Sequence, residues 1–91
     1  MNVIDIDTIK TVDSHIHYLK KYEGRAILMD KKSQIVRHHI TFSIEYGALG
    51  EKNILVDFPE KPDLPVESLI PKILKRIIEL DKSGILANLK N

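Results

Sequence analysis

The chain has 91 residues, 43% hydrophobic and 30% charged, with a formal net charge of +1, which suits one domain (1–91) with a single modest core. The absence of cysteine excludes disulfides, thiolate nucleophiles and cysteine-ligated zinc or iron–sulfur sites. No apolar run approaches the roughly 18 residues that span a bilayer, and no signal-peptide pattern is present, so we expect a cytoplasmic protein without a membrane partner.

The first segment with a regular apolar pattern covers residues 8–22. Apolar side chains recur there at helical spacing, as Ile9, Val12, Ile16 and Leu19. We therefore predict an N-terminal helix over residues 8–22 that ends at Gly24. Because β-branched residues lose χ1 freedom in a helix, the alternative is a strand around His15–Tyr22 that turns at Glu23–Gly24.

Three strands are predicted next. Arg25–Asp30 is typical of a short strand. Between Val36 and Tyr46 apolar and polar residues alternate, which predicts a strand of an antiparallel sheet with one buried and one wet face. A loop bounded by Gly47 and Gly50 leads to a third strand at Asn53–Phe58.

The middle strand is longer than either neighbour, so in a three-stranded meander part of its edge lacks a partner within the monomer. Such an edge favours pairing with another chain. We therefore expect a homodimer interface that uses the edge of Arg37–Tyr46 or the C-terminal helix and tail. Its candidate residues are Arg37, His39, Thr41, Ser43, Glu45, Ile85, Leu86 and Leu89.

The stretch VESLIPKILKRIIELDKSG carries a broad apolar stripe with charged residues mainly opposite, which predicts an amphipathic helix. Pro71 falls in the tolerated first turn if Ser68 is the N-cap, and it kinks the helix if the helix begins at Pro65. Gly84 suits the left-handed position after the last turn, and residues 86–91 are expected to be a frayed tail.

The predicted order is helix, three strands, helix. These elements indicate an α+β fold of two layers, in which a three-stranded antiparallel meander carries an N-terminal helix and a C-terminal amphipathic helix on one face. The other face is left to solvent or to a partner.

The polar residues do not form a recognisable catalytic or metal-binding pattern. Two histidine motifs, HIH at 15–17 and RHH at 37–39, place their histidines on different faces of the predicted helix and strand, so we predict no metal site. No carboxylate spacing requires a catalytic pair, GALG does not match a phosphate loop, and no serine lies in a nucleophile elbow. We therefore predict no catalytic residues, no cofactor and no enzymatic activity.

Basic residues near the first hairpin provide an alternative function. The candidate contacts are Lys20, Lys21, Arg25, Lys31, Lys32 and Arg37. The predicted element order resembles that of the double-stranded-RNA-binding domain, and this resemblance implies contacts to phosphates and 2′-hydroxyls. That family has a lysine-rich start to its second helix, whereas LPVESLIPK here carries Glu67.

We therefore expect a small non-enzymatic protein-interaction or regulatory module that forms a homodimer or binds another protein. Three features favour this function: no catalytic pattern, a long central strand with an unpaired edge, and surplus apolar residues near the C-terminus. Weak binding of RNA or DNA is the alternative, although the balanced charge lacks the basic stripe of a dedicated nucleic-acid binder.

Overall fold

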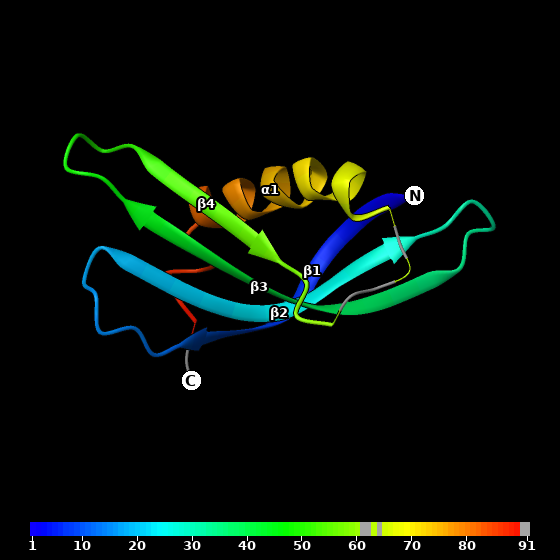
Figure 1. The fold of residues 1–91 in the computed structure, drawn as a ribbon, viewed down its shortest axis with the longest axis horizontal. Helices are drawn as coiled ribbons and strands as arrows, with labels where there is room; N and C mark the ends of the chain where they lie inside the picture. Colours follow the sequence, from blue (N-terminus) through cyan, green and yellow to red (C-terminus); the bar gives the residue numbers. More distant parts are fainter. Residues whose placement is uncertain (61–62, 64, 90–91) are drawn as a thin grey trace.

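The computed structural model describes residues 1–60, 63 and 65–89. Four strands and one helix follow one another along this part of the chain (Figure 1). They are β1 (Asn2–Val12), β2 (Leu19–Met29), β3 (Ile35–Tyr46), β4 (Lys52–Asp57) and α1 (Val66–Lys82).

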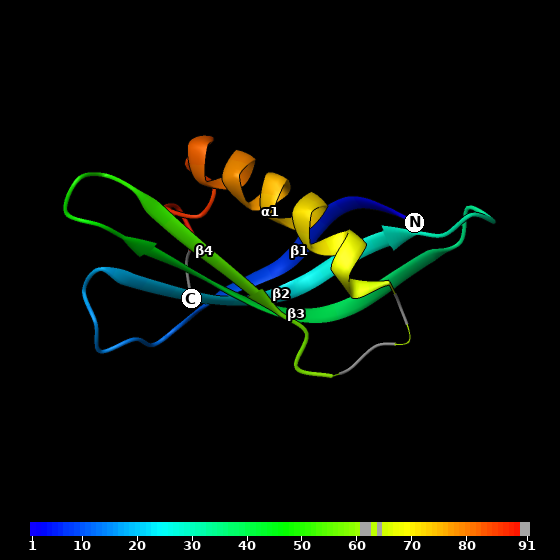
Figure 2. The same cartoon turned by 45° about the horizontal axis from the view of Figure 1, so that its top comes forward.

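The four strands form an antiparallel meander in the order β1-β2-β3-β4. α1 lies across one face of this sheet, and the opposite face carries no helix from the described residues (Figures 1 and 2). The α+β class, the antiparallel sheet and the C-terminal helix are therefore confirmed. The predicted number of strands is wrong, because the sheet has four strands instead of three.

The predicted helix over residues 8–22 is wrong as well. This segment forms the end of β1, a turn and the start of β2. Register shifts between Val3 and Asp5 and between Asp7 and Lys10 interrupt the alternation of β1, and Thr8 has a positive φ of 53°. Each irregularity adds a residue, so apolar side chains three apart face the core together, as Val3, Ile6 and Ile9 do. A spacing of three is thus produced here by a bulged edge strand.

Gly24 lies inside β2, opposite Ile40, and does not end a helix or make a turn. A Cβ atom at this position would lie 3.1 Å from the carbonyl oxygen of Asp7 and 3.4 Å from side-chain atoms of Ile6 and Ile9. Glycine is therefore required by the close approach of the irregular part of β1.

The alternation predicted for β3 is confirmed. Ile40, Phe42 and Ile44 are buried beneath α1, whereas Arg37 and Glu45 are exposed. The ring of Phe42 stacks on that of Tyr22 from β2, with ring centroids 5.0 Å apart. The predicted hairpin loop is also present, closed by a hydrogen bond from the Gly50 amide to the Gly47 carbonyl.

α1 begins at Val66, with Pro65 as its N-cap residue, so Pro71 lies inside the helix. Leu69, Ile73, Ile77 and Leu80 form its buried face. Gly84 adopts the predicted left-handed conformation after the helix, with a φ of 81°. Within 86–91, the segment expected to be frayed, residues 90 and 91 lie outside the described residues and Leu86 is buried in the core.

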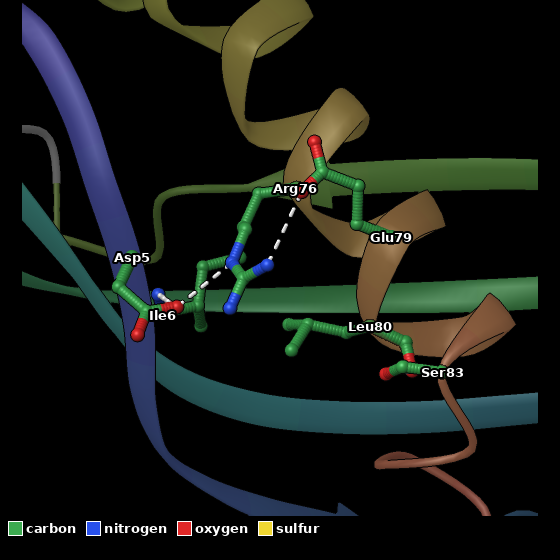
Figure 3. A network of polar contacts seen from close by, with 6 residues as sticks. All are labelled: Asp5, Ile6, Arg76, Glu79, Leu80 and Ser83. Carbon is green, nitrogen blue, oxygen red and sulfur yellow. Dashed lines mark hydrogen bonds and ion pairs between the residues drawn. The ribbon is translucent and has the colours of Figure 1, made fainter.

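Polar contacts fasten α1 to β1. The Arg76 Nε donates a hydrogen bond of 2.9 Å to Asp5 Oδ1, which also accepts one from the Ile6 amide (Figure 3). A second guanidinium nitrogen of Arg76 contacts Glu79 at 3.2 Å, one turn along the helix. Lys72 donates a hydrogen bond to the Met1 carbonyl. The contacts to β1 join residues that are 71 positions apart in the chain, and they orient the helix toward this strand.

Candidate interaction surface

The face of the sheet opposite α1 is built from cross-strand rows of side chains. One row contains Val12, Lys21, Ser43 and Leu55, and the next contains Lys10, Glu23, Thr41 and Asp57. Because side chains alternate across a strand, all these residues point away from the core. We call this surface the helix-free face.

Charges on the helix-free face alternate in sign. The cations are Lys10, Lys21, Arg25 and Arg37, and the anions are Asp7, Glu23, Glu45 and Asp57. Arg25 Nε lies 3.5 Å from Asp7 Oδ1, and His39 Nε2 lies 3.7 Å from Glu23 Oε2. Cation and anion therefore largely compensate one another, and no basic stripe forms there among the residues that the structure describes.

The candidate nucleic-acid contacts are divided among separate places. Lys21, Arg25 and Arg37 lie on the helix-free face, Lys20 faces the other side of β2, and Lys31 and Lys32 lie in the β2–β3 turn. The resemblance to the double-stranded-RNA-binding domain loses its basis, because the chain begins with a strand where that element order requires a helix.

The histidines do not converge. His15 and His17 are exposed in the β1–β2 turn, whereas His38 and His39 lie on opposite faces of β3. Within residues 1–60, 63 and 65–89, no three histidine, aspartate or glutamate side chains lie close enough together to hold a metal ion.

The predicted interface residues fall into two groups. Those from β3 (Arg37, His39, Thr41, Ser43 and Glu45) lie on the helix-free face, but β3 is an inner strand. β2 pairs with its whole length, and β4 pairs with Thr41–Tyr46, so only Ile35–Ile40 has an edge without a strand partner. In the C-terminal group, Ile85 is 45% exposed, Leu89 is half-buried, and Leu86 is only 3% exposed and packs in the core.

The sheet leaves two outer edges, and they differ in regularity. β1 has two register shifts, and side chains from α1 bond to its first residues. Bulges of this kind hinder pairing with another strand. β4 pairs with β3 without a register shift, and its other edge has no strand partner among the described residues. β4 thus provides the regular free edge that sequence reasoning placed on β3.

Apolar side chains accompany this edge on both faces. Leu55, on the helix-free face of β4, is 73% exposed, whereas Ile54 and Val56 are half-buried on the core face. α1 presents Ile70, Leu74 and Ile78 at a spacing of four, which places them on one side of the helix beside its buried face. Ile78 is 42% exposed. We call these six residues the β4 flank.

A polar cluster shows which side of α1 faces β4. Asp81 lies two helical turns after Leu74, accepts hydrogen bonds from Tyr46 and Lys52, and thereby joins this side of the helix to the β3–β4 hairpin. Burial and the neighbouring Asp81 carboxylate raise the pKa of the Tyr46 phenol above 10.0. The cluster therefore fixes the apolar side of α1 next to the β4 edge.

α1 is the one helix of the described residues, and it is not long and apolar enough to span a membrane. Residues 1–82 match the model of one protein family, the BB_0187 family. No curated protein and no solved structure matches the chain. Since the family match covers most of its 91 residues, the chain belongs to this family.

Proposed function

We propose that this family member is a non-enzymatic interaction module that forms a homodimer by pairing β4 with β4 of a second copy. The observation that carries this proposal is the free, regular edge of β4 with Leu55 at its centre, 73% exposed. An exposed edge strand with an apolar side chain favours pairing with another chain.

One register satisfies both faces of the two sheets. In an antiparallel pair about a two-fold axis, opposite residues must point to the same face. If the axis passes at Leu55, Leu55 lies opposite its own copy, Ile54 lies opposite Val56, and Asn53 lies opposite Asp57. The pairs are apolar with apolar and amide with carboxylate, and no like charges meet.

The neighbouring registers are less favourable. An axis at Ile54 places Asp57 opposite Glu51, which brings like charges together. An axis at Val56 places Leu55 opposite Asp57 and Asn53 opposite Pro59, which has no amide hydrogen to donate. The Leu55 register is therefore the one that charge and hydrogen bonding support.

The same two-fold axis brings the helices together. Both copies of α1 then lie on one side of a continuous eight-stranded sheet, and their Ile70, Leu74 and Ile78 side chains face one another across the axis. Burial of this stripe adds apolar area that a six-residue strand pair alone does not provide.

The experiment measures molecular mass by sedimentation equilibrium over a range of protein concentrations. Wild-type protein is expected to be a dimer, and Leu55→Lys is expected to be a monomer because it sets two ammonium groups against each other. Leu49→Lys is the matched control, since Leu49 lies in the β3–β4 loop and is 94% exposed; it should remain dimeric. A monomeric wild type at every concentration contradicts the proposal.

A cross-link tests the register itself. The chain contains no cysteine, so Leu55→Cys introduces a single thiol. Two residues directly opposite in an antiparallel pair have Cα atoms about 4.5–5.5 Å apart, within the range of a disulfide. Mild oxidation should link Leu55→Cys into covalent dimers and should link Ile54→Cys far less. Equal cross-linking of both variants is inconsistent with this register.

A further inference from the structure

The helix-free face has a depression to which all four strands contribute. Its volume is about 270 Å³, and its outward-pointing lining side chains are Val12, Lys21, Thr41, Ser43, Leu55 and Asp57. These residues occupy two adjacent cross-strand rows. Val12 and Leu55 are 41% and 73% exposed and provide apolar walls.

The polar groups of the depression are arranged by charge. Lys21 lies opposite Ser43 in one row, and Thr41 lies opposite Asp57 in the other. Residues two apart along a strand are about 6.8 Å apart, so an ammonium–hydroxyl pair and a hydroxyl–carboxylate pair lie about that far from each other. One end of the depression therefore favours an anionic group and the other favours a cationic group.

These four polar side chains have unused bonding capacity. None of them takes part in a side-chain hydrogen bond or ion pair within the described part of the chain. Elsewhere on the same face, Arg25 is paired with Asp7 and His39 with Glu23. Lys21 and Asp57 thus differ from the charges around them.

We propose that this depression binds a small zwitterion with an aliphatic side chain, such as an α-amino acid. The ligand carboxylate accepts hydrogen bonds from Lys21 and Ser43, and its ammonium group donates to Asp57 and Thr41. The aliphatic side chain packs on Leu55 or Val12. The proposal goes beyond dimer formation and does not depend on it, because the depression is complete within one chain.

A ligand of one charge sign fits less well. A simple anion that contacts Lys21 also meets the Asp57 carboxylate, and a simple cation that contacts Asp57 also meets the Lys21 ammonium. The site is open to water, so we expect weak binding, with a dissociation constant on the order of 1–10 mM. Discrimination between related ligands is therefore more informative than affinity.

The experiment follows backbone amide chemical shifts of the full chain during titration with L-leucine. Saturable shifts are expected at the two rows of the depression. 4-Methylpentanoate, which lacks the ammonium group, and 3-methylbutylamine, which lacks the carboxylate, should bind at least about fivefold more weakly, as expected for loss of one exposed ion pair. No saturable shift, or equal binding of all three compounds, overturns the proposal.

A pair of lysine variants gives a matched control. Lys21→Met should weaken leucine binding about fivefold or more. Lys20→Met makes the same change at the neighbouring residue, which faces the other side of β2, and should leave binding unchanged. Equal effects of the two variants contradict the assigned role of Lys21. Light scattering on the same samples reports the oligomeric state separately, so a failed titration and a failed dimer are distinguished.

Discussion

A comparison of two isoleucines in α1 tests how the helix packs. Ile73 is 0% exposed and faces the sheet, whereas Ile78 is 42% exposed on the side of the helix. Ile73→Ala and Ile78→Ala make the same chemical change in the same helix, so their effects on helix propensity are similar. The difference between the two losses of stability therefore reports burial.

The expected magnitudes differ clearly. Truncation of a fully buried isoleucine to alanine costs about 2–5 kcal/mol, because transfer free energy is lost and a cavity remains. Truncation of the half-exposed Ile78 loses about half the transfer term of 1.5–3 kcal/mol and leaves no enclosed cavity. A chain of 91 residues has a total free energy of unfolding of about 5–14 kcal/mol, so Ile73→Ala removes a large share of it.

Urea unfolding followed by circular dichroism measures both losses. We expect Ile73→Ala to lower the free energy of unfolding by at least about 2 kcal/mol more than Ile78→Ala, with unchanged m-values. In thermal unfolding the same difference corresponds to at least about 8 °C. Equal losses for the two variants would refute the placement of α1 on the sheet through the face that contains Ile73. Measurements at several protein concentrations separate any contribution of Ile78 to the dimer.

Three further predictions concern other contacts. A double-mutant cycle with Asp5→Ala and Arg76→Ala should give a coupling of about 0.5–1 kcal/mol that decreases with added salt, since both side chains are partly exposed; a zero coupling in urea unfolding contradicts the pairing. Burial chiefly raises the pKa values of Tyr22 and Tyr46 above 10.0, so the unfolded chain loses these protons first, and stability that is present below pH 10 should fall as the pH rises further. Tyr46→Phe should lessen that fall in unfolding measured against pH, and an unchanged profile counts against it. Gly24→Val should cost about 1–3 kcal/mol in urea unfolding because its side chain meets a carbonyl oxygen of β1, and a neutral effect argues against this close approach.

Features that depend on residues within one element could be predicted from the sequence. The alternation of β3 reflects one buried and one wet face, and the apolar stripe of α1 reflects the period of a helix. The left-handed turn at Gly84 follows from the absence of a Cβ atom. In each case neighbouring residues contain the whole signal.

The structure of β1 and the candidate sites were decided by tertiary contacts. Val3, Ile6 and Ile9 mimic a helical spacing because two irregularities shift them to one face, and those irregularities are defined only by pairing with β2. The free edge moved from β3 to β4 when a fourth strand joined the sheet. Likewise, Lys21 and Asp57 are far apart in sequence, and only the registers of three strands bring them into one depression. Local patterns record which face of an element is buried, but the choice of neighbouring strands sets the edges and the sites between strands.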